Sequence, residues 1–153
     1  MTCSAWAFSR KRDVLDESFL RNLHKRMFGN VWRWAGRFRT TPRNIGIDAY
    51  RIGAELRQLL GDVRYQTEHE SLAPDEISLR FHHRLVAIHA FPNGNGRHAR
   101  MAADLLAVQL GRSRFTWGSA DLVEPRDVRR RYVSALRAAD EHDIGPLLEF
   151  ARA

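Results

Sequence analysis

Apolar residues recur every three or four positions through most of the chain, which is the spacing of an amphipathic helix. Asp13 is expected to cap the first helix and Gly29 to end it. Pro74 is expected to begin the third helix, and Gly111 to close the fourth, which should be the most buried. The pattern predicts helices over residues 13–27, 48–68, 74–88, 97–110, 127–139 and 146–150.

Residues 31–47 do not follow the helical pattern. Trp32 and Trp34 alternate with other residues, and the sequences Thr-Thr-Pro and Asn-Ile-Gly that follow are typical of turns. We interpret the segment as irregular chain with a short β-hairpin; a packed aromatic loop is the alternative. No repeat, low-complexity tract or domain boundary is present. The sequence therefore predicts an all-α fold, a single domain over residues 1–153 with one small hairpin.

The composition is that of an ordinary globular domain. The chain has 153 residues, of which 44% are hydrophobic and 28% charged, enough to bury a sizeable core. Its one cysteine, Cys3, excludes an internal disulfide and fits a reducing compartment. No apolar run has the length of a membrane span, and no apolar signal segment is present at the start. We therefore expect a cytoplasmic protein with no membrane partner.

A formal net charge of +7 makes nucleic acid worth considering as a partner. Lysine occurs only at positions 11 and 25, so most of the basic residues are arginine. Arginine-rich chains are common where genomic composition favours arginine. We therefore favour a generally basic surface over a dedicated nucleic-acid face.

A short stretch that begins at His89 separates the third and fourth predicted helices and carries groups suited to phosphate chemistry. Gly94 and Gly96 flank an asparagine in a loop that opens a helix, where backbone N–H groups point outward from the positive end of the helix dipole. Arg97 and Arg100 follow at a spacing that can place both on one side of the helix. His89 can exchange a proton near neutral pH. Together these residues favour phosphoryl or nucleotidyl transfer.

Each of these residues also has an ordinary structural interpretation. A histidine is favoured at a helix C-terminus by the dipole, as His89 would be. The glycines are compatible with a plain turn, and Arg100 with a structural ion pair. Their coincidence within residues 89–100 is what favours the functional interpretation.

These residues carry a family resemblance. His89, Phe91, the run Gly94–Arg97 and Arg100 match the signature His-x-Phe-x-(Asp/Glu)-Gly-Asn-Gly-Arg-x-x-Arg of Fic/Doc proteins at every fixed position except the acidic one. So many matches at fixed spacing are far more specific than a lone glycine pattern. The segment 27–46 is similar to the region that leads into the substrate-docking flap of that family. The whole chain most resembles the branch known as mobile mystery protein B.

The resemblance implies a Fic-type helical bundle and a protein adenylyltransferase, which would transfer AMP from ATP to a Ser, Thr or Tyr hydroxyl of a target protein. His89 would be the general base. The phosphates of the co-substrate ATP would rest on the loop 94–96, with Asn95 as a donor. Arg97 would hold the β-phosphate region, and Arg100 the γ-phosphate.

The resemblance also makes residues 37–47 a flap, whose edge would pair with a segment of the target as an added strand. Phe91 is expected to anchor the active-site loop in the core. The flap residues that would dock the target are Arg39, Thr40, Thr41 and Asn44.

Two positions depart from the family pattern. Asn93 stands where relatives have Asp or Glu to hold Mg²⁺, and an amide oxygen is a weaker ligand for a hard cation. We expect Mg²⁺ to take part with weakened binding; a metal held mainly by phosphates, or by another donor, is the alternative. Ala90 replaces a usual proline and loosens the start of the loop.

Three histidines lie on predicted helices outside this stretch. His24 is expected to be a surface or packing residue. His82 and His83 do not match a zinc spacing with His89, and by the resemblance one of them lines the core beside the active site.

Many relatives are held inactive by a helix with the motif Ser/Thr-x-x-x-Glu-(Gly/Asn), whose glutamate pairs with the arginine that corresponds to Arg100. No Ser or Thr precedes a Glu by four residues in this chain. The inhibitory helix would then come from another chain, such as an antitoxin in a bacterial toxin–antitoxin pair, or be lost, or belong to an N-terminal extension.

Two other functions stay open. A related enzyme could transfer UMP, phosphate or phosphocholine instead, although the intact run Gly94–Arg97 favours a nucleoside monophosphate. A non-enzymatic module that binds nucleic acid through its arginines is the other alternative, because Asn93 could mark a degenerate site.

Overall fold

The computed structural model describes residues 2–9, 12–119 and 124–153. These residues form helices and loops, and no strand occurs among them. The prediction of an all-α fold is confirmed. The elements are α1 Cys3–Phe8, α2 Glu17–Phe28, the 3₁₀ turn η1 Ala49–Arg51, α3 Ile52–Glu68, α4 Pro74–Ile88, α5 Asn95–Gln109, α6 Pro125–Asp140 and α7 Gly145–Arg152.

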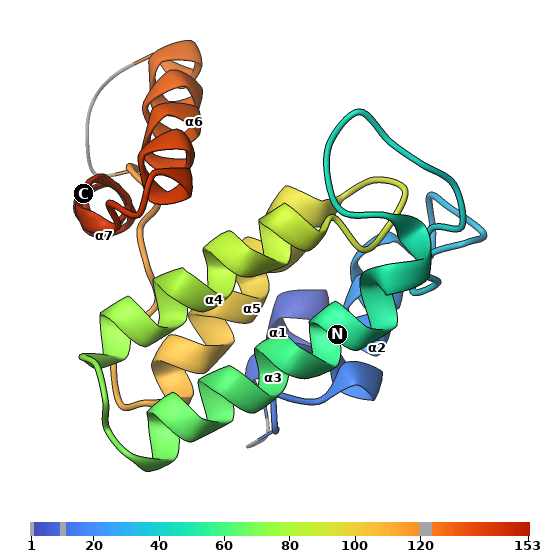
Figure 1. Ribbon diagram of the computed structural model, residues 1–153, viewed down its shortest axis with the longest axis horizontal. Helices are drawn as coiled ribbons and strands as arrows, with labels where there is room; N and C mark the ends of the chain where they lie inside the picture. Colours follow the sequence, from blue (N-terminus) through green and yellow to red (C-terminus); the bar gives the residue numbers. More distant parts are fainter. Residues whose placement is uncertain (1, 10–11, 120–123) are drawn as a thin grey trace.

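Helices α1 to α5 share one hydrophobic core. Figure 1 shows α3 alongside α4, with α5 behind α4 and the pair α1 and α2 behind α3. Each helix contributes its apolar stripe, as the spacing of the sequence predicts. The fully buried side chains of this core include Leu20, Leu23, Leu59, Phe81 and Leu106.

Helix α5 is the most buried helix, as predicted. Four of its nine buried residues are alanines, whose small side chains let neighbouring helices approach closely. Val108 of the same helix is apolar but 43% exposed. The buried alanines are Ala99, Ala102, Ala103 and Ala107.

Helices α6 and α7 form a smaller second core against α4 and α5. Leu147 and Phe150 of α7 pack with Leu79 of α4 and with Ala103 and Ala107 of α5. Figure 1 shows this pair, in orange and red, at one edge of the bundle. The C-terminal helices therefore extend the bundle on the side of α4 and α5.

Helix α2 begins later than predicted. Asp16, not Asp13, is the N-cap: its Oδ2 atom accepts a hydrogen bond from the Phe19 N–H at 2.9 Å. Asp13 instead accepts from the Leu15 N–H, which forms a turn that buries Val14 and Leu15 before the helix. The Asp13 cap is wrong because the apolar pattern continues into this turn.

The predicted β-hairpin at 37–47 is wrong: the segment, called the flap below, contains no strand. Its backbone pairs with the loop after α4 rather than with itself, through Arg39 N–H to Ala90 O at 2.9 Å and Ile47 N–H to Ile88 O at 3.5 Å. The alternating tryptophans that indicated a strand lie in a turn, where the rings of Trp32 and Trp34 stack 4.6 Å apart.

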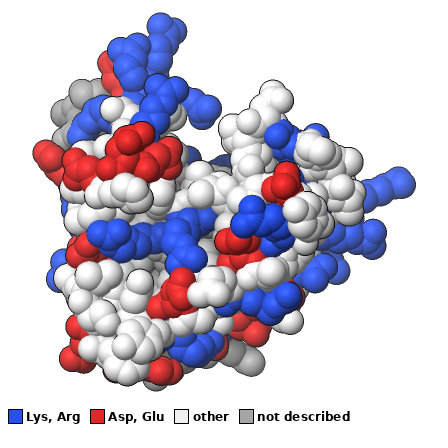
Figure 2. Space-filling view, viewed as in Figure 1, with Lys and Arg blue, Asp and Glu red and all other residues white. Residues whose placement is uncertain are grey.

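The described helices do not reach the length and hydropathy that a membrane span would need. On the face shown in Figure 2, basic side chains are scattered among acidic and uncharged ones rather than gathered in a single stripe.

Candidate active site

His89 ends α4 in an unusual backbone conformation. It is the C-cap of the helix, with φ 53° and ψ 60° in the left-handed region, and its N–H still bonds to Leu85 O at 3.2 Å. A left-handed residue with a Cβ costs roughly 1–2 kcal/mol. Such strain persists only where the surroundings enforce it, and it is frequent at active sites.

The loop after His89 is fastened to the core by Phe91 and Asn95. Phe91 is buried, and its ring stacks on His24 with centroids 3.8 Å apart, so the expected anchoring role is confirmed. Asn95 accepts from the Phe91 N–H at 2.9 Å and donates to Phe91 O at 2.7 Å. The Asn95 side chain thus closes the loop through its bonds to Phe91.

His24 fixes the other side of the loop. Its Nδ1 accepts from the Gly36 N–H at 2.9 Å, so its Nε2 carries the proton and donates to Asn93 O at 3.0 Å. Burial lowers the pKa of His24, which keeps the ring neutral. This role is not among those predicted from the sequence. The signal was the position of His24 on the inward stripe of α2, four residues after Leu20 and four before Phe28.

The start of α5 leaves backbone donors free. Gly94 is the N-cap with φ 79°, and a Cβ there would lie 2.6 Å from Cε2 of Phe28, so only glycine fits. The cap offers no side-chain acceptor to the first turn. A Cβ at Gly96 would meet nothing within 4 Å. The first amides of α5 therefore face open space with the helix dipole behind them, an arrangement suited to an anion.

Arg97 and Arg100 have no carboxylate partner as far as the chain is described. The guanidinium of Arg97 lies over the ring of Phe28 at 4.7 Å, and that of Arg100 over Tyr132 at 4.8 Å. The Nε atom of Arg100 is buried and has no hydrogen-bond acceptor. No acidic residue occurs in the sequence between Glu76 and Asp104. Both cations are therefore available to an anionic ligand.

His82 supports Arg100 through Tyr132. His82 is fully buried on α4, and its Nε2 lies 2.8 Å from the hydroxyl of Tyr132. Burial lowers the pKa of His82 to about 3, so the ring is neutral. His82 is thus the histidine that lines the core beside the site. His83 instead lies 2.7 Å from a carboxylate oxygen of Asp140.

The residues present fit a protein-held Mg²⁺ poorly. Asn93 is exposed, and its Oδ1 already accepts from the Gly94 N–H at 2.8 Å. In the described residues no cluster of three His, Cys, Asp or Glu side chains is placed to hold a metal. An amide oxygen engaged in its own loop is a weak ligand for this cation.

The flap lies against His89, and its predicted docking residues separate into two groups. Thr40, Thr41 and Asn44 are exposed. Arg39 is only 3% exposed, and its guanidinium donates to backbone carbonyls, including His89 O at 2.5 Å. Gly46, with φ 95°, lies so close that a Cβ would be 2.6 Å from Cβ of His89. Of the predicted docking set, the two threonines and Asn44 are therefore accessible from solvent and Arg39 is not.

The imidazole of His89 is half-buried and its pKa is lowered. Burial is the main cause, and the positive charges of Arg39 and Arg43 add to it. A lowered pKa keeps the ring neutral near pH 7. In that state one ring nitrogen can accept a proton from a hydroxyl.

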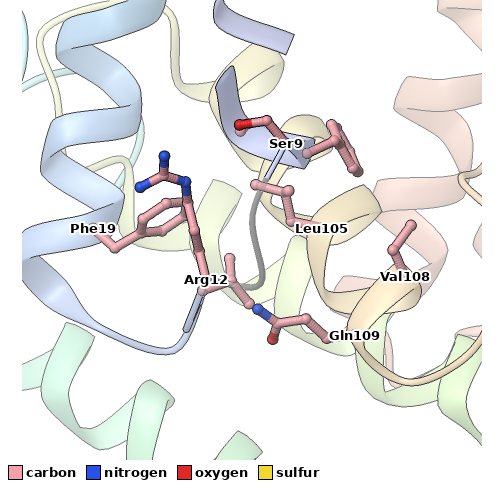
Figure 3. A pocket seen from close by; sticks show the side chains of 9 residues that line it. Ser9, Arg12, Phe19, Leu105, Val108 and Gln109 are labelled. Atoms are coloured by element: carbon pink, nitrogen blue, oxygen red, sulfur yellow. The ribbon is translucent and has the colours of Figure 1, made fainter. Parts of the chain in front are cut away.

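A cavity of about 330 Å³ lies elsewhere, between α1, α2 and α5 (Figure 3). It is lined by Phe19, Leu105, Val108 and Gln109, among others. The last three of these residues belong to the C-terminal half of α5, whereas the candidate site lies at the N-terminus of that helix. The cavity is therefore separate from the site.

The chain resembles known proteins over most of its length. The model of the Fic/DOC family matches residues 14–107. Protein adenylyltransferase fic-1 of Caenorhabditis elegans is 27% identical over 154 aligned residues, which cover 98% of this chain and 28% of that protein. The chain thus spans less than a third of the length of this curated relative.

Solved structures share the fold. A structure of Fic-1 from C. elegans superposes with a TM-score of 0.75 and 25% identity, over 90% of this chain and 39% of that one. The crystal structure of BepC from Bartonella tribocorum, which has AMPPNP bound, gives a TM-score of 0.72 and 20% identity, over 98% and 79% of the two chains.

Proposed function

The chain belongs to the Fic/DOC family, and from this premise we propose that it is a protein adenylyltransferase, which moves AMP from ATP to a Ser, Thr or Tyr hydroxyl of a target protein. The observation that carries the proposal is the coincidence of three groups where α4 ends and α5 begins. These are the free amides at the start of α5, two arginines without a carboxylate partner in the described chain, and the neutral imidazole of His89.

In the proposed reaction the amides of the first turn of α5 hold phosphate oxygens of ATP, and Arg97 and Arg100 neutralise the β- and γ-phosphates. The target hydroxyl oxygen attacks the α-phosphorus, the bond from that phosphorus to the bridging α,β-oxygen breaks, and pyrophosphate leaves. His89 takes the hydroxyl proton and releases it to solvent afterwards. The products are the adenylylated protein, pyrophosphate and a proton.

Gly96 supports the same assignment. Glycine inside a helix costs about 1 kcal/mol relative to alanine, and no neighbouring protein atom requires it here. A phosphate that approaches the backbone closely would explain its presence.

Mg²⁺ is proposed to be held mainly by phosphate oxygens and water, because Asn93 fits it poorly. If Asn93 does reach the ion, Asn93→Asp should lower the Mg²⁺ concentration needed for transfer. An unchanged metal titration would exclude this residue from the metal site.

We further propose that Thr40, Thr41 and Asn44 meet the target, because they are the exposed members of the predicted docking set. We also propose that the protein is cytoplasmic and that an antitoxin or another inhibitory partner regulates it. The absence of an internal inhibitory motif from the sequence supports such a partner.

The test uses ATP labelled on either the α- or the γ-phosphate, with the full chain and a cell extract as the source of acceptors. The proposal expects protein labelling from α-labelled ATP only, and none with a His89→Ala variant. Labelling from the γ-phosphate would indicate phosphotransfer instead. No labelling from either, with ATP or with the other nucleoside triphosphates, would refute nucleotidyl transfer.

A further inference from the structure

Arg39 holds the end of α4 from a distant part of the sequence. Its Nε donates to His89 O at 2.5 Å and its Nη2 to Ile88 O at 3.3 Å. The same guanidinium donates to Ile47 O and, through Nη1, to Thr41 O at 3.1 Å. One side chain therefore ties both arms of the flap to the last residues of α4.

The surroundings of the Arg39 guanidinium are those of a cation with a structural role. Arg39 is 3% exposed, and in the described part of the chain it has no carboxylate within ion-pair distance. A buried charge is tolerated only where polar groups replace its water shell, and here backbone carbonyls do so. Two of them belong to the C-terminus of α4, where carbonyls lack helical partners and the helix dipole favours a cation. Arg39 thus caps this helix from outside.

The capped residue is His89, whose left-handed backbone needs an external constraint. Arg39 bonds its carbonyl on one side, and Gly46 of the flap contacts its Cβ on the other. The Arg39 N–H also bonds to Ala90 O at 2.9 Å. The direction in which the imidazole leaves the backbone is therefore set by the flap.

We infer that Arg39 is a positioning residue for His89, which fixes the backbone of the proposed base and does not dock the target. The inference rests on the proposed function only in that His89 is the base. The positioning itself is a property of the fold and can be measured without turnover.

The charge of Arg39 has a second effect on the same group. Arg39 and Arg43 of the flap both lower the pKa of His89, and Asp48 is the acidic group that acts on Arg39. Arg39 therefore acts on His89 through its hydrogen bonds and through its charge. Two substitutions separate the effects: Arg39→Lys keeps the charge but cannot bond the same set of carbonyls, and Arg39→Met removes both.

The experiment follows the His89 ring signal by NMR in labelled protein during a pH titration, with the assignment taken from His89→Ala. Transfer rates are measured across the same pH range. Arg39→Met should raise the pKa of His89 towards its ordinary value and move the acid limb of the rate profile to higher pH. Arg39→Lys should keep that limb in place. Because small misplacements of a catalytic group are costly, kcat should fall about tenfold or more in both variants.

Arg37→Met is the matched control. Arg37 is an exposed flap arginine that does not contact His89, so its loss changes the flap charge by the same amount. It should leave the His89 titration unchanged. Thermal melts show whether each variant is folded. If Arg39→Met does not fold, kcat is compared between the wild type and Arg39→Lys alone.

Two results would overturn the inference. Either both Arg39 variants keep the wild-type titration and kcat, or they raise only the KM for the target, which would make Arg39 a docking residue after all. If the wild-type protein transfers nothing, the proposed function fails, while a change in the His89 ring signal at fixed pH in Arg39→Lys, which keeps the charge, still decides whether Arg39 positions His89.

Discussion

The start of α5 and the flap are both rich in arginine, but they use their guanidinium groups in opposite ways. Arg39 of the flap donates to carbonyls on several sides and is buried. Arg97 and Arg100 lie over aromatic rings with no acidic partner in the described residues, and one buried N–H of Arg100 has no acceptor. An arginine satisfied by the protein belongs to its framework. An arginine left unsatisfied is available to a ligand.

The two regions also differ in how they are fastened. The flap is held by a permanently charged group, Arg39. The active-site loop and its surroundings are held by neutral imidazoles: His24 bonds to Asn93 O, and His98 to Leu20 O at 2.8 Å. The contrast predicts that acid weakens the region held by neutral imidazoles before it weakens the flap.

The largest expected effect comes from removing the base between the two regions. His89→Ala should lower the transfer rate by about 10²–10⁴-fold, the usual contribution of a general base. The melting temperature should stay close to that of the wild type, because the His89 ring is only half-buried and contributes little to the packing of the core. Rates from α-labelled ATP and a thermal melt test this together. Retained transfer in a folded variant would place the base elsewhere.

Acid should weaken the part of the molecule that neutral imidazoles fasten. Burial lowers the pKa of His98 to about 4 and that of His82 to about 3. The unfolded chain therefore binds protons first as pH falls below about 6.5, so stability present above that pH is lost towards pH 4. At pH 5 each histidine should cost about 2 kcal/mol of unfolding free energy.

Urea denaturation at pH 7 and pH 5 measures this loss. His98→Gln should reduce the difference between the two pH values, and the same change at the exposed His69 should not. Equal stability at both pH values would mean that these histidines are not held neutral.

A smaller effect tests the unsatisfied arginines. Arg97→Gln should weaken binding of a non-hydrolysable ATP analogue by about tenfold, because it removes a charge-assisted bond to phosphate. Arg37→Gln removes an equal charge from the flap and should leave binding unchanged. Isothermal titration calorimetry compares the two. Equal weakening by both variants would indicate that only the overall charge matters.

The smallest effect compares two glycines inside helices, Gly96 of α5 and Gly61 of α3. A Cβ added at either position would meet no neighbouring atom within 4 Å. Alanine at either position should stabilise the protein by about 0.4–1 kcal/mol. Gly96→Ala should also weaken nucleotide binding several-fold, and Gly61→Ala should not. Melts and binding titrations separate the two outcomes, and unchanged binding in both would remove close phosphate approach as the reason for Gly96.

Much of the start of α5 could be predicted from the sequence because its chemistry is local. The glycines, the arginines and His89 lie within a few residues of one another, so their spacing already places them on one loop. Helices α2 to α7 followed from periodicity for the same reason, although α1 was not predicted, and local signals such as Pro74 and Gly29 marked some of their ends.

The flap could not be predicted in this way because its structure depends on distant partners. Arg39 looks like a surface residue among other arginines, and only the fold brings it to the carbonyls at the end of α4. The backbone of the flap pairs with residues 88–90, so local turn signals were misread as a hairpin. His24 was underestimated for the same reason, since both its partners lie outside its own helix.

The alanine face of α5 has a consequence for how far the chain can vary. The small side chains let α4 and α5 pack close together. The loop that joins the two helices, which begins at His89, therefore has to span only a short distance. A bulkier residue at Ala99 or Ala102 would push the two helices apart and strain the loop between them. Substitutions well inside the bundle would then alter the reach of His89 without touching it, and the tolerance for change at these alanines should be narrow.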